Sequence, residues 1–115
     1  MKELMTISII NLKGGAAKTS TILNLGGLLC ENGRSPLLID CDLQQSATRW
    51  AAQGGGKFPF PVIPIEINEN VKQFKDKLDE ITKKHKADVI LFDTPPQLQK
   101  EALLTALLSD IILIP

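Results

Sequence analysis

Short runs of apolar, mostly β-branched residues alternate along this chain with longer segments whose apolar positions recur every three or four residues. The short runs are typical of strands buried on both faces. A further run carries prolines at two positions, which is typical of a strand near a sheet edge. The predicted strands are 6–12, 35–42, the proline-interrupted 60–66, 87–93 and the strand that begins at 111–115.

Helices are predicted between these strands. After a glycine pair, apolar residues return at helical spacing at Ile22, Leu25, Leu28 and Leu29. Asn32 and Gly33 then supply a stop, because glycine readily takes a positive φ. A second helix begins near Asn70, with one apolar face and one face of Lys, Asp and Glu; the apolar residues are Val71, Phe74, Leu78 and Ile81. Shorter helices are predicted over 44–52 and 100–110.

Alternation of strand and helix predicts an α/β fold: a doubly wound, mostly parallel sheet with helices on both faces and right-handed crossovers. The final strand is of the buried type and runs to Pro115 with no helix after it. A doubly wound domain normally has further elements. We therefore expect residues 1–115 to be the N-terminal part of a single domain that is incomplete here; otherwise a partner must cover the exposed surface.

Composition narrows the classes of function. With 43% apolar residues in 115, the chain has enough apolar residues to form a core, and no apolar run is long enough for a membrane span. No signal peptide is recognisable, and Cys30 and Cys41 have neither metal-site nor disulfide spacing, so a cytoplasmic protein with free thiols is predicted. The net charge of zero gives no argument for nucleic acid, and 4% aromatic residues argue against a base-stacking surface.

One loop carries candidate chemistry. The segment "NLKGGAAKTS" (11–20) lies between a predicted strand and a predicted helix. Gly14 and Gly15 permit the backbone to curl so that its N–H groups converge on an anion, and the following helix N-terminus adds partial positive charge. Lys18 and Thr19 stand at the offset where a phosphate-binding loop has its lysine and its Mg²⁺-ligating hydroxyl. The alternative is an ordinary glycine turn beside an incidental Lys-Thr pair.

Aspartates end two of the predicted strands. Asp40 and Asp42 close the second strand, and Asp93 closes the strand at 87–93. Ligands of open α/β sheets bind beyond the carboxyl ends of the strands, where the glycine loop also belongs. Mg²⁺ prefers oxygen ligands together with a phosphate. Each aspartate alone could be a plain strand-end residue, but three beside such a loop predict a magnesium–phosphate site.

These motifs together resemble the ParA/MinD family of deviant Walker-A ATPases. Its loop, K-G-G-x-G-K-[ST], is similar to Lys13 through Thr19, and the lysine before the glycines is the family signature. The segments "LLIDCDLQQSAT", "VILFDTPPQ" and "SDIILIP" are similar to its second motif, its Walker B strand and its next strand. The resemblance covers nearly the whole chain in order. It implies a P-loop NTPase fold, ATP and Mg²⁺ as cofactors, and a homodimer that forms on ATP binding.

The resemblance also implies residue roles. Lys18 would contact the β- and γ-phosphates, and Lys13 would stabilise charge on the partner's nucleotide. Asp42 would position the attacking water, which makes Lys13, Lys18 and Asp42 the expected catalytic residues. Thr19, Asp40 and Asp93 would hold Mg²⁺. The expected nucleotide-binding residues are Lys13, Gly14, Gly15, Ala16, Ala17, Lys18, Thr19 and Ser20.

Two positions depart from the family pattern. Ala17 replaces a glycine, so a positive φ there would cost alanine roughly 1 kcal/mol or a little more, and its methyl group could crowd the phosphates. We therefore expect slow ATP use. Leu43 stands where the family usually has proline, which should change loop stiffness more than chemistry.

The resemblance leaves three functions open. One is an ATPase that drives plasmid or chromosome partition with a ParB-like centromere-binding adaptor, associated with the nucleoid through non-specific DNA contacts that lie largely in the missing C-terminal part. Another is a MinD-like positioning ATPase, although no membrane-binding helix is visible and no membrane contact is expected. The third is a catalytically impaired fragment that acts as a nucleotide-binding or interaction module.

Overall fold

The computed structural model describes residues 4–10, 16–41, 49, 52, 59–65, 71–94 and 109–113, and of residues 16–19 it describes the backbone alone. Helix α1 is Ala16–Glu31 and helix α3 is Val71–His85. The strands are β1 (Met5–Ile9), β2 (Pro36–Asp40), β3 (Val62–Pro64), β4 (Val89–Asp93) and β5 (Ile111–Leu113). They form one sheet in the order β3-β2-β4-β1-β5, and every described pair of neighbours is parallel.

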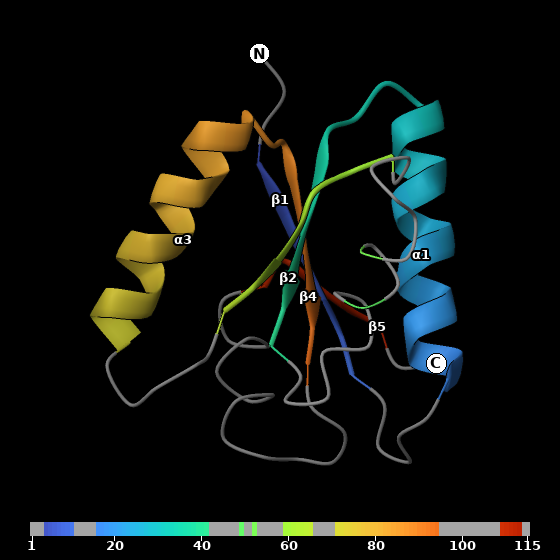
Figure 1. The fold of residues 1–115 in the computed structure, drawn as a ribbon, viewed down its shortest axis with the longest axis horizontal. Helices are drawn as coiled ribbons and strands as arrows, with labels where there is room; N and C mark the ends of the chain where they lie inside the picture. Colours follow the sequence, from blue (N-terminus) through green and yellow to red (C-terminus); the bar gives the residue numbers. More distant parts are fainter. Residues whose placement is uncertain are drawn as a thin grey trace.

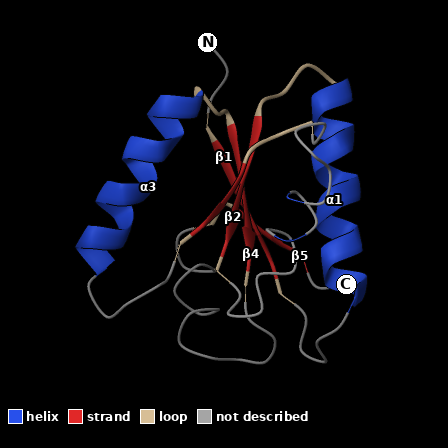
Figure 2. Cartoon of the chain, viewed as in Figure 1, coloured by secondary structure: helices blue, strands red, loops and turns tan. Residues whose placement is uncertain are grey.

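The sheet stands between two helices, with α1 against one face and α3 against the other (Figure 1; Figure 2). Each face has its own apolar cluster, because successive side chains of a strand point to opposite sides. Ile22 of α1 is fully buried against Leu38 and Leu91 on one face. Phe74 and Leu78 of α3 are buried with Ile90 and Phe92 on the other. The predicted doubly wound α/β fold is therefore confirmed.

Both described helices end on residues of positive φ. Gly33 has a φ of 76°, and its N–H bonds the carbonyl of Cys30 while the Arg34 N–H bonds that of Leu29, a Schellman pattern. This confirms the stop predicted at Asn32-Gly33. Lys86 ends α3 in the same way with a φ of 53°, and no signal in the sequence predicts a lysine in that conformation.

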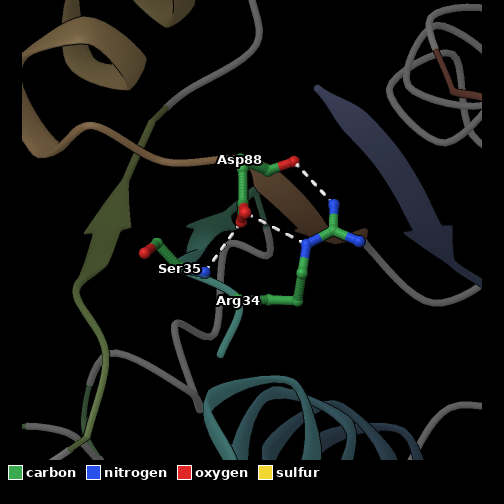
Figure 3. Close-up of polar contacts among 3 residues, drawn as sticks. All are labelled: Arg34, Ser35 and Asp88. Atoms are coloured by element: carbon green, nitrogen blue, oxygen red, sulfur yellow. Dashed lines mark hydrogen bonds and ion pairs between the residues drawn. The ribbon is translucent and has the colours of Figure 1, made fainter. Parts of the chain in front are cut away.

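A polar clamp joins α1 to the sheet at the amino-terminal end of β4 (Figure 3). Asp88 accepts hydrogen bonds from Arg34 Nε through Oδ2 at 3.0 Å and from the Ser35 N–H through Oδ1 at 2.7 Å. The Asp88 carbonyl also accepts from the Met5 N–H at 3.0 Å. One aspartate therefore fixes the turn after α1 and the starts of β1, β2 and β4 relative to one another.

Strand and helix boundaries follow the prediction closely. The strands expected at 6–12, 35–42, 60–66 and 87–93 correspond to β1, β2, β3 and β4. All are shorter than expected, β3 most of all at 3 residues, and among the described strands β3 lies at the edge of the sheet, as its prolines indicated. In α1, Leu28 is the exception: it is 56% exposed, although its spacing groups it with Leu25 and Leu29, which are half-buried against the core. Arg49 and Ala52 are helical, and the rest of the helix expected over 44–52 lies outside the described residues.

The last described strand corrects one expectation. The run at 111–115 was predicted to be buried, but Ile111, Ile112 and Leu113 are between 36% and 47% exposed. Among the described strands, β5 lies at the edge of the sheet and pairs with β1 alone. The helix expected over 100–110 lies outside the description as far as 108, and Ser109 and Asp110 already have non-helical structure.

In the described part of the chain, neither helix combines the length and the apolar character that crossing a bilayer requires.

Two adjacent glycines of α1 provide a test of its packing. A Cβ on Gly26 would stand 2.4 Å from the ring of buried Phe60, whereas a Cβ on Gly27 would meet nothing within 4 Å. We expect Gly26→Ala to lower the free energy of unfolding by about 1–3 kcal/mol through overpacking. Gly27→Ala should raise it by about 1 kcal/mol because alanine is the better helix former. Denaturant unfolding of both variants measures the difference, and equal effects would contradict this packing.

Candidate functional site

The order in which strands are added to the sheet reverses between β4 and β1. The chain leaves β1 toward β2 through α1, and it leaves β4 toward β5, so the two neighbouring strands send their connections to opposite sides. In open α/β sheets such a switch point leaves a crevice at the carboxyl ends of the strands, and ligands bind there. α1 begins beside this same end of the sheet (Figure 1).

Two carboxylates lie side by side at that edge. Asp40 ends β2 and Asp93 ends β4, and the two are register partners in the parallel ladder. Their neighbours two residues earlier, Leu38 and Leu91, belong to the apolar cluster under α1, so strand alternation turns both aspartates to the α1 side. Asp40 is 2% exposed and Asp93 is fully buried.

Buried carboxylates at adjacent strand positions need compensating charge or hydrogen-bond donors, since an uncompensated pair would be very costly. A hard cation such as Mg²⁺, which takes oxygen ligands, suits such a pair. The sequence-based prediction that Asp40 and Asp93 meet at the sheet edge is confirmed. Asp42, the third acid, lies outside the described residues, and no group of three candidate ligands occurs among the residues described.

The first turn of α1 contains the second half of the predicted phosphate loop. Lys13, Gly14 and Gly15 lie outside the described residues, and of Ala16, Ala17, Lys18 and Thr19 only the helical backbone is known. Ser20 is an exposed residue of the first turns of α1. A strand precedes the glycine segment of the sequence and a helix follows it, as the motif requires.

The backbone at Ala17 answers one question raised by the sequence. Ala17 is the second residue of α1, and among the described non-glycine residues Lys86 alone has a positive φ. The positive-φ strain considered for alanine at this position is therefore absent, because a helical backbone suits alanine well.

Hydrogen bonds join the end of β4, which carries Asp93, to both of its neighbours, β2 and β1. The Cys41 N–H donates to the Asp93 carbonyl at 2.9 Å, which extends the β2–β4 ladder by one residue. On the other side, the hydroxyl of Thr94 donates to the Ile9 carbonyl at 2.8 Å. Sequence reasoning did not single out Thr94, although a hydroxyl directly after a strand-ending aspartate was the available signal.

Neither cysteine suggests a nucleophile. Both thiols are free, as predicted; Cys41 is buried and Cys30 is half-buried. Burial, and secondarily the nearby Glu31 carboxylate, raises the pKa of the Cys30 thiol. A thiol with a raised pKa carries little thiolate at neutral pH and is a poor nucleophile.

Several known proteins are similar to this chain in sequence. A family model described as an AAA domain matches residues 4–57. The protein ParA of Rhizobium radiobacter is 27% identical in an alignment that covers 95% of this chain and 47% of ParA. The maintenance of carboxysome distribution protein A of Gloeobacter kilaueensis is 33% identical over 97 residues, covering 84% of this chain and 41% of that protein. This chain belongs to the ParA/MinD family.

A solved structure agrees with this ParA/MinD assignment. A plasmid partition protein of Borrelia burgdorferi B31, solved with AMPPNP bound, is 26% identical, with a TM-score of 0.78 over 99% of this chain and 63% of that one. The chain spans about half or less of the length of the curated relatives described above. Residues 1–115 therefore have the P-loop NTPase fold of this family.

The paired aspartates yield a prediction with an internal control. If the two aspartates hold Mg²⁺, Asp40→Asn and Asp93→Asn should each weaken Mg²⁺-dependent nucleotide binding by at least about tenfold, because each removes a negative charge from the cation site. Nucleotide binding in EDTA should change far less. Asp88→Asn makes the same substitution at the opposite end of β4 and should leave the Mg²⁺ dependence unchanged. Titration of a fluorescent ATP analogue measures all three, and equal losses with and without Mg²⁺ would contradict a cation site.

Proposed function

We propose that this chain binds ATP and Mg²⁺ at the carboxyl edge of its sheet and dimerises when ATP is bound, as a ParA-like ATPase. The observation that carries the proposal is the buried, register-paired couple of Asp40 and Asp93 on the side of α1, at the end of the sheet where that helix begins. A cation beside a helix N-terminus and a glycine loop is the arrangement that a nucleoside triphosphate requires.

The chain's residues would divide the work as follows. The backbone N–H groups of 14–17 and the Lys18 ammonium would bind the phosphates, and Thr19 would supply a hydroxyl to the cation. Asp40 and Asp93 would hold that cation through water, and Asp42 would orient the attacking water. Bound Mg²⁺ supplies charge neutralisation at the phosphates. Catalysis of this kind rests on positioning and electrostatics and asks no covalent step of the protein.

Lys13 would act across the dimer. An ammonium group from one protomer that reaches the partner's γ-phosphate stabilises the charge that develops during transfer, as an arginine finger does. Hydrolysis would then depend on dimerisation, and the rate of ATP hydrolysis would set the lifetime of the dimer. This links the ATP site to a switch rather than to metabolism.

The process driven by that switch is proposed from relatives. Those described above include ParA itself, a carboxysome distribution protein and a plasmid partition protein. We infer that the dimer positions DNA or another large cargo. In this proposal the dimer binds DNA non-specifically, and a ParB-like adaptor stimulates ATP hydrolysis. DNA contacts are expected to involve residues that correspond to the part of those relatives not matched by this chain.

A second candidate function is favoured by Ala17. With a methyl group where the family has glycine, the chain could bind ATP and turn it over poorly, serving as an interaction module within a dimer. The two functions share the site and differ in turnover.

Two lysine variants separate binding from hydrolysis. Lys18→Ala should weaken ATP binding by about 100-fold, since one charge-assisted contact to the phosphates is lost. Lys13→Ala should bind ATP normally and lose about 1,000-fold in turnover because the charge supplied across the dimer is missing. Lys72→Ala, on the exposed face of α3, is the matched control and should change neither quantity. Native ATP affinity in Lys18→Ala would refute the proposed site.

Replacing the methyl group tests why turnover would be slow. Ala17→Gly should raise ATP turnover several-fold if the methyl crowds the phosphates. The same change should lower the free energy of unfolding by about 1 kcal/mol, because glycine is the poorer helix former. Phosphate release and denaturant unfolding measure the two effects. Turnover that does not rise would show that Ala17 is not what slows the enzyme.

A further inference from the structure

Thr94 makes a hydrogen bond across the switch point of the sheet. Its side chain is fully buried, and its hydroxyl donates to the Ile9 carbonyl at 2.8 Å. The register of the β1–β4 ladder ends with the pair Ile9 and Asp93, so this contact stands one residue beyond the last paired position of β4. A side chain thus extends the ladder where the two connections diverge.

The location of that bond gives it a particular consequence. Ile9 is the last residue of β1, and the segment 11–15 that follows leads directly into α1. On its other side β1 is fixed as well, because the Ile10 N–H donates to the Leu113 carbonyl at 2.9 Å. The Thr94 hydroxyl therefore ties the end of β1, which precedes segment 11–15, to the end of β4 that carries Asp93.

We propose that Thr94 is a positioning residue that holds the carboxyl end of β1, from which the chain enters segment 11–15, at a fixed separation from Asp93, the carboxylate proposed to hold the cation. The inference rests on the proposed function, since it assigns Thr94 to the same ATP–Mg²⁺ site. A loop and a carboxylate that share one triphosphate–cation ligand must keep a fixed separation, and misplacement by about 1 Å can cost a hundredfold in rate. Residues that orient metal-holding groups typically contribute 10- to 100-fold to affinity.

A merely structural role would have a different signature. Thr82 on α3 offers the comparison, because its hydroxyl donates to the Leu78 carbonyl at 2.7 Å and it is half-buried. Thr94→Val and Thr82→Val both keep the side-chain shape and remove one hydroxyl-to-carbonyl bond. Only Thr94→Val removes a bond to Ile9, at the end of β1. Thr94→Ser keeps the hydroxyl and should rescue the function.

The experiment compares these three variants with the native chain in two measurements. Titration of a fluorescent ATP analogue with Mg²⁺ should show affinity about tenfold weaker in Thr94→Val, within about twofold of native in Thr94→Ser, and unchanged in Thr82→Val. Amide hydrogen exchange without nucleotide should show Ile10 and the loop amides of 11–15 exchanging about five- to tenfold faster in Thr94→Val alone.

Native affinity and native exchange at the loop in a folded Thr94→Val protein would overturn the inference, as would failure of Thr94→Ser to restore either. The exchange measurement needs no ligand. If the native chain binds no Mg²⁺–ATP, the proposed function fails, and the positioning role falls with it whatever the exchange shows. If the native chain binds and Thr94→Val binds equally well, only the role of Thr94 fails.

Discussion

The central constraint of this molecule is the register of β4, the strand that pairs with β2 on one side and with β1 on the other. That register places Asp93 opposite Asp40 and opposite Ile9 at once. A slip of one residue would turn Asp93 to the opposite face and separate it from α1, because side chains alternate along a strand. The candidate chemistry therefore depends on backbone pairing in the buried centre of the sheet.

The two ends of β4 carry aspartates with different roles. Asp88, just before the strand, is engaged by Arg34 and by the Ser35 N–H, and it holds the turn after α1 in place. Asp93, at the far end, is buried beside a second carboxylate. Because α1 runs between these ends, the clamp at its C-terminus helps to set where its N-terminus lies. The Asp88 clamp and the candidate chemistry therefore lie at opposite ends of β4.

Sequence patterns predicted the parallel sheet, the helix stop at Gly33 and the meeting of Asp40 with Asp93, because all three follow from strand periodicity, glycine's conformational freedom and the rule that parallel strands end at one edge. They did not predict the exposure of Leu28 or of β5, since burial depends on which neighbours pack alongside. Nor did they reveal Thr94 or the Asp88 clamp. Those contacts join residues 85 and 54 positions apart, and only the fold brings them together.

The most direct measurement is a crystal structure of this chain with AMPPNP and Mg²⁺. The expected result is a cation that contacts Asp40 and Asp93 directly or through one water, with the triphosphate at the N-terminus of α1. A nucleotide bound elsewhere on the protein, or a cation that touches neither aspartate, would contradict the assignment of this sheet edge as the ATP site.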